Sequence, residues 1–210
     1  MLSAKRLLWN TARWLSALIG VTCFHFRAYR QSLVPKRGGV LIVSNHQSYL
    51  DPVIVAVALE RPSSFMARST LFVNPFFGAL IRNLNAFPVV RGGRDMQAVR
   101  EAVRRLEGGA CLVVFPEGTR TRDGHIGPLQ HGILAVADRA GVPIVPAVVD
   151  GAFEAWPKGR GIRPWPIRVM YGRAMTAAER RGVSREDLIA RLHDDMERMQ
   201  RELKQIAARS

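Results

Sequence analysis

The chain has 210 residues, of which 48% are hydrophobic, and its 31 Lys and Arg against 17 Asp and Glu give a formal net charge of +14. This length and composition fit one domain with a hydrophobic core, or one domain plus an appendage, and exclude a repeat or low-complexity protein. So basic a surface favours a polyanionic partner, either nucleic acid or an anionic membrane. Two cysteines, Cys23 and Cys111, provide neither a disulfide framework nor the ligand spacing of a metal site.

The N-terminal segment, residues 1–37, combines apolar and aromatic side chains with flanking basic ones. No acidic residue precedes Asp51, and the longest uncharged run, Trp14 to Phe26, has thirteen residues. A spanning helix needs about 20 apolar residues, and no A-x-A cleavage site follows the run as it would in a signal peptide. We therefore predict a monotopic segment on the cytoplasmic face of an anionic membrane, rather than a nucleic-acid-binding surface. The alternative is a helix that completes the core of a domain formed by residues 38–210.

Beyond this segment, short apolar runs alternate with stretches of helical spacing. Strands are predicted at residues 40–44, 64–67, 86–90, 110–115, 143–149 and 167–171. Helices are predicted at residues 52–59, 74–82, 95–107 and 132–139, and an amphipathic helix that packs on the domain begins after Ser184. Pro146 suggests that strand 143–149 lies at a sheet edge or contains a bend. This order predicts an α/β fold with a mixed, largely parallel sheet flanked by helices, in which sites form at the carboxyl ends of strands.

The stretch SNHQSYLDP, residues 44–52, places a histidine five residues before an aspartate, directly after the first predicted strand. On a regular helix two such side chains would point about 140° apart, so His46 and Asp51 can meet only if the chain between them is not helical. Pro52 disfavours helical geometry at the residue before it and suits the first position of a helix. Asp51 is therefore predicted as the N-cap of the helix at 52–59, with His46 on the loop that enters it.

A histidine and an aspartate that converge at a strand end suggest acid–base chemistry. A neutral imidazole can accept a proton near pH 7, and a carboxylate on its other nitrogen would fix the tautomer and stabilise the imidazolium. The hypothesis is a general base, His46, with Asp51 as its orienting carboxylate. The alternative is a helix cap beside an ordinary loop histidine. No second His or Cys lies nearby at ligand spacing, so no metal is expected.

The second motif, FPEGTR at residues 115–120, directly follows strand 110–115. Pro116 and Gly118 predict a tight turn that gathers backbone amides, a hydroxyl and a guanidinium at the strand end. Thr119 and Arg120 can hold a phosphate, which arginine does with two parallel hydrogen bonds. Glu117 could order the arginines or a substrate hydroxyl. The alternative is a turn that merely carries surface charges.

Arg91 ends another apolar strand and precedes Gly92-Gly93, a setting that suits contact with an anion. On its own this signal is weak. The chain contains no P-loop and no G-x-G-x-x-G, which argues against a nucleotide-dependent enzyme. It also contains no G-x-S-x-G, which argues against a hydrolase with that serine elbow.

Four stretches, taken together and in order, resemble the four blocks of the glycerolipid acyltransferases. They are Asn45-His46-x-Ser48-x-x-Asp51, Phe87-Pro88-Val89-Val90-Arg91, Phe115-Pro116-Glu117-Gly118-Thr119-Arg120 and Val142-Pro143-Ile144-Val145-Pro146. The similarity is greatest to 1-acyl-glycerol-3-phosphate acyltransferases of bacterial type and covers about residues 38–151. The first and third blocks are specific, whereas the second and fourth are loose.

This resemblance implies a reaction and a role for each motif. His46 would take the proton from the free hydroxyl of a lysophospholipid, Asp51 would orient it, and the oxygen would attack an acyl thioester to give phosphatidic acid. Residues 117–120, namely Glu117, Gly118, Thr119 and Arg120, would bind the glycerol phosphate with the help of Arg91. The donor would be acyl-CoA or acyl carrier protein, and neither a metal nor a bound cofactor is expected.

One departure from the family pattern affects the expected acceptor. Many members carry a lysine just before the glycine that follows the third block, where this chain reads Gln130-His131-Gly132. His131 could partly replace that lysine, or the acceptor could be another lysophospholipid or lyso-lipid. A third possibility, a basic lipid- or nucleic-acid-binding protein without catalysis, explains the net charge and none of the motifs.

Overall fold

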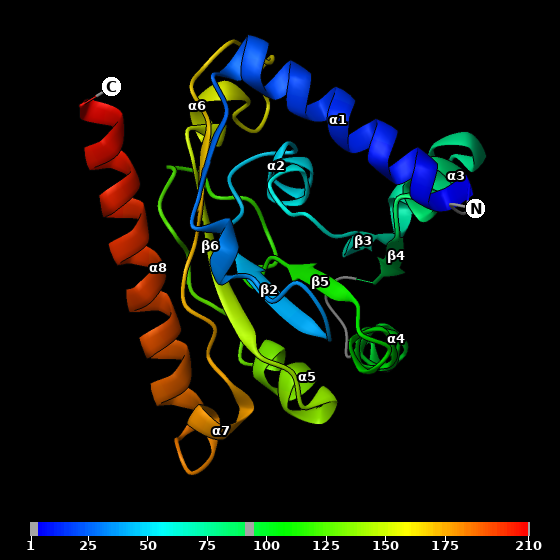
Figure 1. The fold of residues 1–210 in the computed structure, drawn as a ribbon, viewed down its shortest axis with the longest axis vertical. Helices are drawn as coiled ribbons and strands as arrows, with labels where there is room; N and C mark the ends of the chain where they lie inside the picture. The colour runs from blue at the N-terminus through cyan, green and yellow to red at the C-terminus, as the bar shows by residue number, and fades with distance from the viewer. Residues whose placement is uncertain (1–3, 91–94, 210) are drawn as a thin grey trace.

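Seven strands form one sheet at the centre of the computed structural model, which describes residues 4–90 and 95–209. The strand order is β1-β7-β6-β2-β5-β3-β4 (Figure 1). The strands are β1 (Arg27–Tyr29), β2 (Val40–Ser44), β3 (Ser63–Arg68), β4 (Ala86–Val89), β5 (Cys111–Val114), β6 (Ile144–Asp150) and β7 (Arg168–Tyr171). Every neighbouring pair is parallel except β6 and β7, which are antiparallel. The predicted α/β fold with a mixed, largely parallel sheet is therefore confirmed.

Helices cover both faces of this sheet. They are α1 (Ala4–Phe24), α2 (Asp51–Val57), α3 (Pro75–Asn83), α4 (Met96–Glu107), α5 (Gly132–Ala140), α6 (Ala152–Ala155), α7 (Ala177–Arg180) and α8 (Arg185–Ala208), with 3-10 turns η1 (Gln31–Leu33) and η2 (Ser69–Phe72). Alternate residues of β2 point to opposite faces: Leu41 and Val43 pack with α4, α5 and α8, whereas Val40 and Ile42 pack with α2 and α6. All four are fully buried, so the sheet is the middle layer of an α/β/α sandwich (Figure 1).

The first predicted strand and the long C-terminal helix agree closely with the structure. Strand β2 spans the predicted residues 40–44, and α8 begins one residue after its N-cap, Ser184, whose side chain accepts a hydrogen bond from the Asp187 amide. The apolar face of α8 is buried against the sheet, as predicted. Strand β1 and helices α6 and α7 were not predicted, because elements of three or four residues are too short to show a period.

Two local expectations need correction. Asp51 is not an N-cap: it is the first residue of α2, the capping position is Leu50, and no side chain caps this helix.

Strand β6, which contains Pro146, lies inside the sheet between β7 and β2 and not at its edge. Pro146 falls between the bridge that joins Ile144 to Met175 and the first β7 pair, Ala147 with Tyr171, where the ladder on that side is interrupted. Proline has no backbone N–H to donate, and this interruption allows Pro146 to occupy an interior strand without the loss of a ladder hydrogen bond to β7.

The N-terminal residues contribute both to the sheet and to the surface. Strand β1 pairs with β7, and α1 lies against α2, where Trp9 is buried and Arg13 Nε donates a hydrogen bond to the Val57 carbonyl at 3.1 Å. The outer face of α1 is apolar and exposed, with 68% of Trp14 and 61% of Leu18 accessible to solvent. Of the helices in the described part of the chain, none combines the length and apolar composition needed to cross a bilayer.

Candidate active site

The two chemistry-bearing loops meet because their strands are neighbours. Strands β2 and β5 pair in parallel, with Val43 opposite Val114, so both end at the same edge of the sheet. The loop after β2 carries His46 and the loop after β5 carries Glu117. The Thr121 amide donates to the His46 carbonyl at 2.8 Å, which ties the two loops together. Residues 71 positions apart are thus brought into one site.

His46 and Asp51 form a close pair. His46 Nδ1 lies 2.7 Å from Asp51 Oδ2, the Asp51 side chain is fully buried, and 13% of the His46 side chain is exposed. An ionised carboxylate can only accept, so this bond places the imidazole proton on Nδ1. The other nitrogen, Nε2, then presents a lone pair, and no hydrogen bond from the described residues reaches it. This is the arrangement of a general base with an orienting carboxylate.

Asp51 organises the loop that precedes it. Its Oδ2 also accepts the amides of Gln47 and Ser48, at 2.6 and 2.7 Å. The carboxylate therefore turns back toward the loop and does not cap α2. Burial raises the pKa of Asp51, while the bonds from His46 and the two amides favour its ionised form. Three donors at one oxygen fix the carboxylate in place, and through it they fix the imidazole.

His46 is also held by the loop after β5. The ring of Phe115 stacks on the imidazole at a centroid distance of 4.4 Å, and the His46 amide donates to Glu117 Oε1 at 3.0 Å. Burial raises the pKa of Glu117, although the amides of His46 and Gly127 favour the ionised form. Glu117 thus binds the backbone of the histidine, a contact that the sequence did not indicate.

Gly118, Thr119 and Arg120 form the rim of this loop. Gly118 adopts a left-handed conformation, with φ of 69°, and a Cβ there would approach Gln130 Nε2 to 2.6 Å, so the turn requires glycine. The hydroxyl-bearing Thr119 is exposed. The guanidinium carbon of Arg120 lies 3.5 Å from the centroid of the Tyr49 ring. Arg120 Nη1 is buried and has no hydrogen-bond partner among the described residues.

Aromatic residues that sequence reasoning did not single out complete the rim. Tyr49 follows His46 by three positions and contacts Trp156 at a centroid distance of 5.2 Å. Ser48 Oγ donates to the Trp156 carbonyl at 3.3 Å, which connects this loop to the turn after α6. No sequence spacing indicates such a contact between residues more than a hundred positions apart.

Asn45 anchors the start of the His46 loop to β6. Its Nδ2 donates to the Val149 carbonyl at 2.9 Å, and its Oδ1 accepts the Val149 amide at 2.8 Å. The side chain is buried and both of its polar atoms are bonded to the β6 backbone, so Asn45 supports the loop.

A family model described as Acyltransferase matches residues 25–150 of the chain, a range that contains both loops of the site. The chain belongs to the acyltransferase family. The resemblance seen in the four sequence blocks is thereby confirmed.

Several known acyltransferases are similar to this one. It is 33% identical over 119 residues to a chloroplastic 1-acyl-sn-glycerol-3-phosphate acyltransferase, BAT2, of Brassica napus, covering 56% of this chain and 34% of that protein. It is 31% identical over 170 residues to the 1-acyl-sn-glycerol-3-phosphate acyltransferase of Pseudomonas aeruginosa, covering 79% of this chain and 64% of that protein. The chain thus spans less than two thirds of the length of these curated relatives.

The crystal structure of the 1-acyl-sn-glycerophosphate (LPA) acyltransferase PlsC from Thermotoga maritima has the same fold. Its TM-score is 0.81 at 25% sequence identity, and the superposition covers 96% of this chain and 82% of that one. The similarity therefore includes α1 and α8, which lie outside the range of the family model.

An apolar pocket of about 110 Å³ lies between α1 and α2 of this acyltransferase, beside the loop after β2 that carries His46. Ile19 and Phe24 line it from α1, and Leu50 and Val53 line it from the start of α2. Leu50 is the residue directly before Asp51, so the pocket adjoins the site.

Three further observations bear on the predicted site residues. Arg91 lies outside the described residues. His131 is exposed, and its Nδ1 is 4.0 Å from Glu186 Oε1 of α8. Within residues 4–90 and 95–209, one group of side chains is close enough to share a metal ion, His193, Asp194 and Glu197 on α8, and none of these belongs to the two loops of the acyltransferase site.

Proposed function

We propose that this acyltransferase moves an acyl chain from an acyl thioester to the free hydroxyl of 1-acyl-sn-glycerol 3-phosphate, giving phosphatidic acid. The observation that carries this proposal is the 2.7 Å contact between His46 Nδ1 and Asp51 Oδ2, which leaves Nε2 available as a base. The names of the relatives support the choice of acceptor.

The reaction requires one base that later acts as an acid. His46 Nε2 accepts the hydroxyl proton while the oxygen attacks the thioester carbonyl, and Asp51 stabilises the imidazolium that forms. The tetrahedral intermediate then collapses, the C–S bond breaks, and the imidazolium protonates the leaving thiolate. An ester and a thiol result, His46 is regenerated, and neither an acyl-enzyme nor a cofactor is needed.

Arg120 is the best placed of the described residues to bind the acceptor phosphate. It has no carboxylate partner in the described chain, it is held over the Tyr49 ring, and it lies on the same loop as the exposed Thr119 hydroxyl and the Gly118 turn. A guanidinium without a counter-ion favours phosphate binding. Arg91 is proposed as a second cation for this phosphate.

Glu117 is assigned a different role from its neighbours. A carboxylate would repel a phosphate, and Glu117 Oε1 already accepts the His46 amide at 3.0 Å. Glu117 is therefore proposed to position the catalytic loop and not to contact the phosphate.

Two apolar surfaces are proposed to contact lipid: the pocket between α1 and α2, and the exposed face of α1. The pocket between α1 and α2 adjoins Asp51 and is proposed to receive part of an acyl chain. The donor is proposed to be acyl-CoA or acyl carrier protein. The exposed apolar face of α1, within the N-terminal segment 1–37, is proposed to lie on the cytoplasmic surface of an anionic membrane. Residues 38–210 are proposed as the acyltransferase domain, and the N-terminal segment adds β1 to its sheet.

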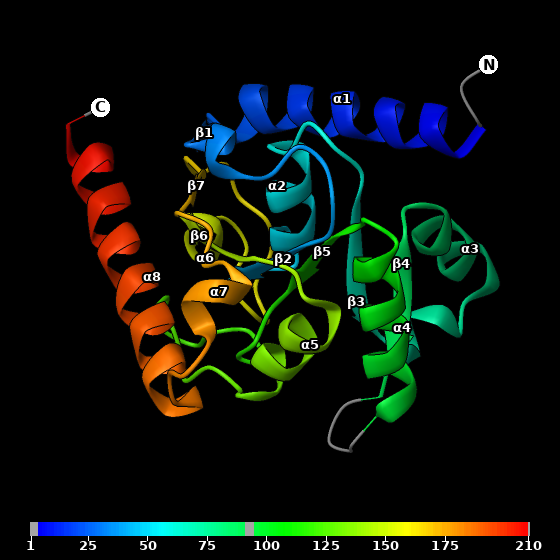
Figure 2. The same cartoon turned by 60° about the horizontal axis from the view of Figure 1, so that its bottom comes forward.

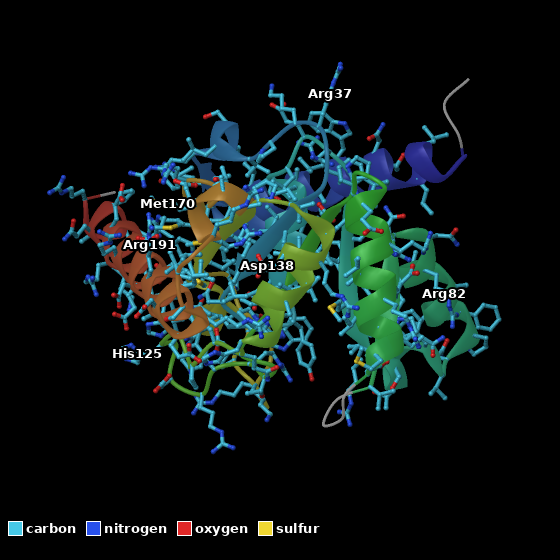
Figure 3. All side chains as sticks on the ribbon, turned by 90° about the horizontal axis from the view of Figure 1, so that it is seen from below. Arg37, Arg82, His125, Asp138, Met170 and Arg191 are labelled. Carbon is cyan, nitrogen blue, oxygen red and sulfur yellow. The ribbon has the colours of Figure 1, made fainter. Side chains whose placement is uncertain are left out.

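The deciding experiment compares wild type with His46→Ala in acyl transfer from acyl-CoA to 1-acyl-sn-glycerol 3-phosphate in mixed micelles. Loss of a general base predicts a fall in kcat of at least about 10²-fold. The matched control is His125→Ala, since His125 is an exposed histidine at the margin of the molecule (Figure 3) and should leave turnover unchanged. Circular dichroism verifies folding. Turnover that survives in His46→Ala would remove His46 from the mechanism.

A second acceptor class, another lysophospholipid or lyso-lipid, is proposed because His131 stands where many family members have lysine, and its imidazole lies near Glu186 of α8. Lysophosphatidate, lysophosphatidylglycerol and monoacylglycerol should therefore be compared at equal mole fraction. Preference for lysophosphatidate supports the proposal; preference for either of the others would transfer it to that acceptor.

A further inference from the structure

Helix α3 and the turn η2 before it expose large apolar side chains. The exposed fraction is 87% for Phe76 and 80% for Val73. Three neighbours, Leu71, Phe77 and Leu80, are exposed by between 44% and 47%. Scattered apolar residues are normal on a protein surface, but five within ten positions form a patch, and such patches mark interaction sites.

This exposure is built into the fold and does not come from a loosely attached segment. The Asn74 side chain accepts the Phe77 amide at 2.9 Å, and Pro75 occupies the first helical position. Gly78 is buried: a Cβ at this position would come within 3.0 Å of the Phe72 carbonyl oxygen. The glycine face of α3 therefore packs closely on η2, and Phe76, two residues earlier and so on the opposite face of the helix, points away from it into solvent.

The charge around the patch identifies its partner. No acidic residue occurs between Glu60 and Asp95 in the sequence. Of the basic residues in this interval, Arg68 and Arg82 are exposed, and the Arg82 guanidinium lies 4.9 Å above the Phe72 ring. Figure 3 shows Arg82 at the outer margin of the molecule. Apolar side chains flanked by arginines and free of acids match a bilayer with anionic headgroups.

The position of the patch is consistent with the same partner. Helices α3 and α1 are in contact, and Figures 1 and 2 place α3 near the N-terminal half of α1. Turn η2 directly follows β3, which pairs in parallel with β5, so it lies at the edge of the sheet where the catalytic loops are found. A surface that included α1 and α3 would therefore border the active site.

We propose that α3 is a second membrane-inserting element, which enters an anionic bilayer through Val73, Phe76 and Phe77 beside α1. Two separate contacts fix the orientation of the protein on the membrane, whereas a single helix leaves rotation about its axis free. This inference rests on the proposed membrane-surface function. Its test measures contact with lipid and not turnover, so the two proposals can fail separately.

The test places an environment-sensitive fluorophore on single cysteines in a Cys23→Ser background, which is needed because Cys23 is exposed while Cys111 is buried. The positions are Phe76→Cys on α3, Leu15→Cys on α1, and Val183→Cys, which is 42% exposed in the turn between α7 and α8. Vesicles of phosphatidylcholine and phosphatidylglycerol are then added. A blue shift at positions 76 and 15 but not at 183 supports the proposal. A shift at 15 alone, or at none of the three, overturns it.

A second measurement covers the possibility that the patch binds another copy of the chain. Val73→Ser with Phe76→Ser should reduce binding to these vesicles about tenfold, since two apolar contacts are lost. Val183→Ser should reduce it little. Activity on substrate dispersed in detergent should be unchanged in both variants. Analytical ultracentrifugation should show the same mass for wild type and variant; a wild-type dimer that becomes a monomer in the variant would instead assign the patch to self-association.

Discussion

The backbone of His46 is as tightly held as its side chain. Its amide donates to Glu117 Oε1, its carbonyl accepts the Thr121 amide, and its ring lies between the Phe115 face and the Asp51 carboxylate. These contacts come from two loops that belong to neighbouring strands. These contacts pre-organise His46 for its proposed role as a base, since little reorganisation is needed when the proton moves.

The proposed role of Glu117 is tested by its effect on kcat and KM separately. Glu117→Ala leaves the His46 amide without its partner, so the loop relaxes and kcat should fall about tenfold or more while KM for lysophosphatidate changes less than threefold. Glu117→Gln retains an acceptor oxygen and should recover most of kcat. If KM rises strongly and kcat does not fall, then Glu117 contacts the acceptor as the sequence resemblance implied.

For single residues, the sequence predicted the contact between His46 and Asp51 but not the other contacts that surround it. The Asp-Pro step after a strand correctly indicated that His46 and Asp51 converge. It did not indicate that the Asp51 carboxylate turns back to the Gln47 and Ser48 amides, because an aspartate before Pro can accept from either side. Tyr49 and Trp156 were missed since their contact depends on tertiary structure alone.

Among the elements, α4 illustrates how charge joins a helix to the edge of the sheet. Arg105 Nη1 donates to Ser64 Oγ of β3 and to the Asn85 carbonyl, and its guanidinium carbon lies 4.5 Å from the Phe87 ring centroid. Glu101, one turn earlier, holds Arg105 Nε at 2.6 Å and also pairs with Arg104. The carboxylate therefore orients the arginine that connects α4 to β3 and β4.

This pairing predicts acid-sensitive stability. The hydrogen bond from Arg104, together with the charge and hydrogen bond of Arg105, lowers the pKa of Glu101 from 4.5 to about 2. A lowered pKa stabilises the folded state above the unfolded value, and the effect disappears as the pH falls from about 4.5 toward 2. Glu101→Gln should thus lower the free energy of unfolding by about 1 kcal/mol or less at pH 7, because the pair is partly solvated, and by almost nothing at pH 2. Urea titrations at both pH values measure this; a difference that grows in acid would contradict the ion-pair explanation.

Element prediction succeeded where the pattern was long. Helices α4 and α8 have clear apolar periods, α8 also has a clear start at the Ser184 cap, and β2 is a continuous apolar run. The interior position of β6 could not be predicted, because Pro146 usually marks an edge. Its tolerance depends on an interruption in the ladder to β7 that only the assembled sheet displays.

Over the whole molecule, net positive charge is concentrated in two parts of the chain, because most acidic residues lie elsewhere. Residues 1–50 contain seven basic and no acidic side chains, and residues 61–94 contain five basic and no acidic side chains, whereas residues 95–210 carry 15 of the 17 acidic ones. The first two ranges include α1 and α3, the helices with the most exposed apolar surface. Most of the net charge of +14 therefore comes from the two ranges that contain α1 and α3, in agreement with the proposed orientation on an anionic membrane.

This asymmetry predicts that the position of a basic residue decides its contribution to membrane binding. Lys36 lines the same surface cavity as Arg13 of α1, and Arg37 projects from the molecule nearby (Figure 3). Neutralising both, by Lys36→Gln with Arg37→Gln, should weaken binding to anionic vesicles about tenfold. Each basic side chain near such a surface contributes about 1 kcal/mol, and the contribution of Lys36 is reduced because it already pairs with Glu60.

The control, Arg139→Gln with Arg181→Gln, removes the same charge from exposed positions in the later half of the chain and should have little effect. Flotation at about 0.05 and 0.5 M salt completes the test, because screening should abolish the difference between the two variants. Equal losses in both variants would mean that total charge, and not its distribution, governs attraction to the bilayer.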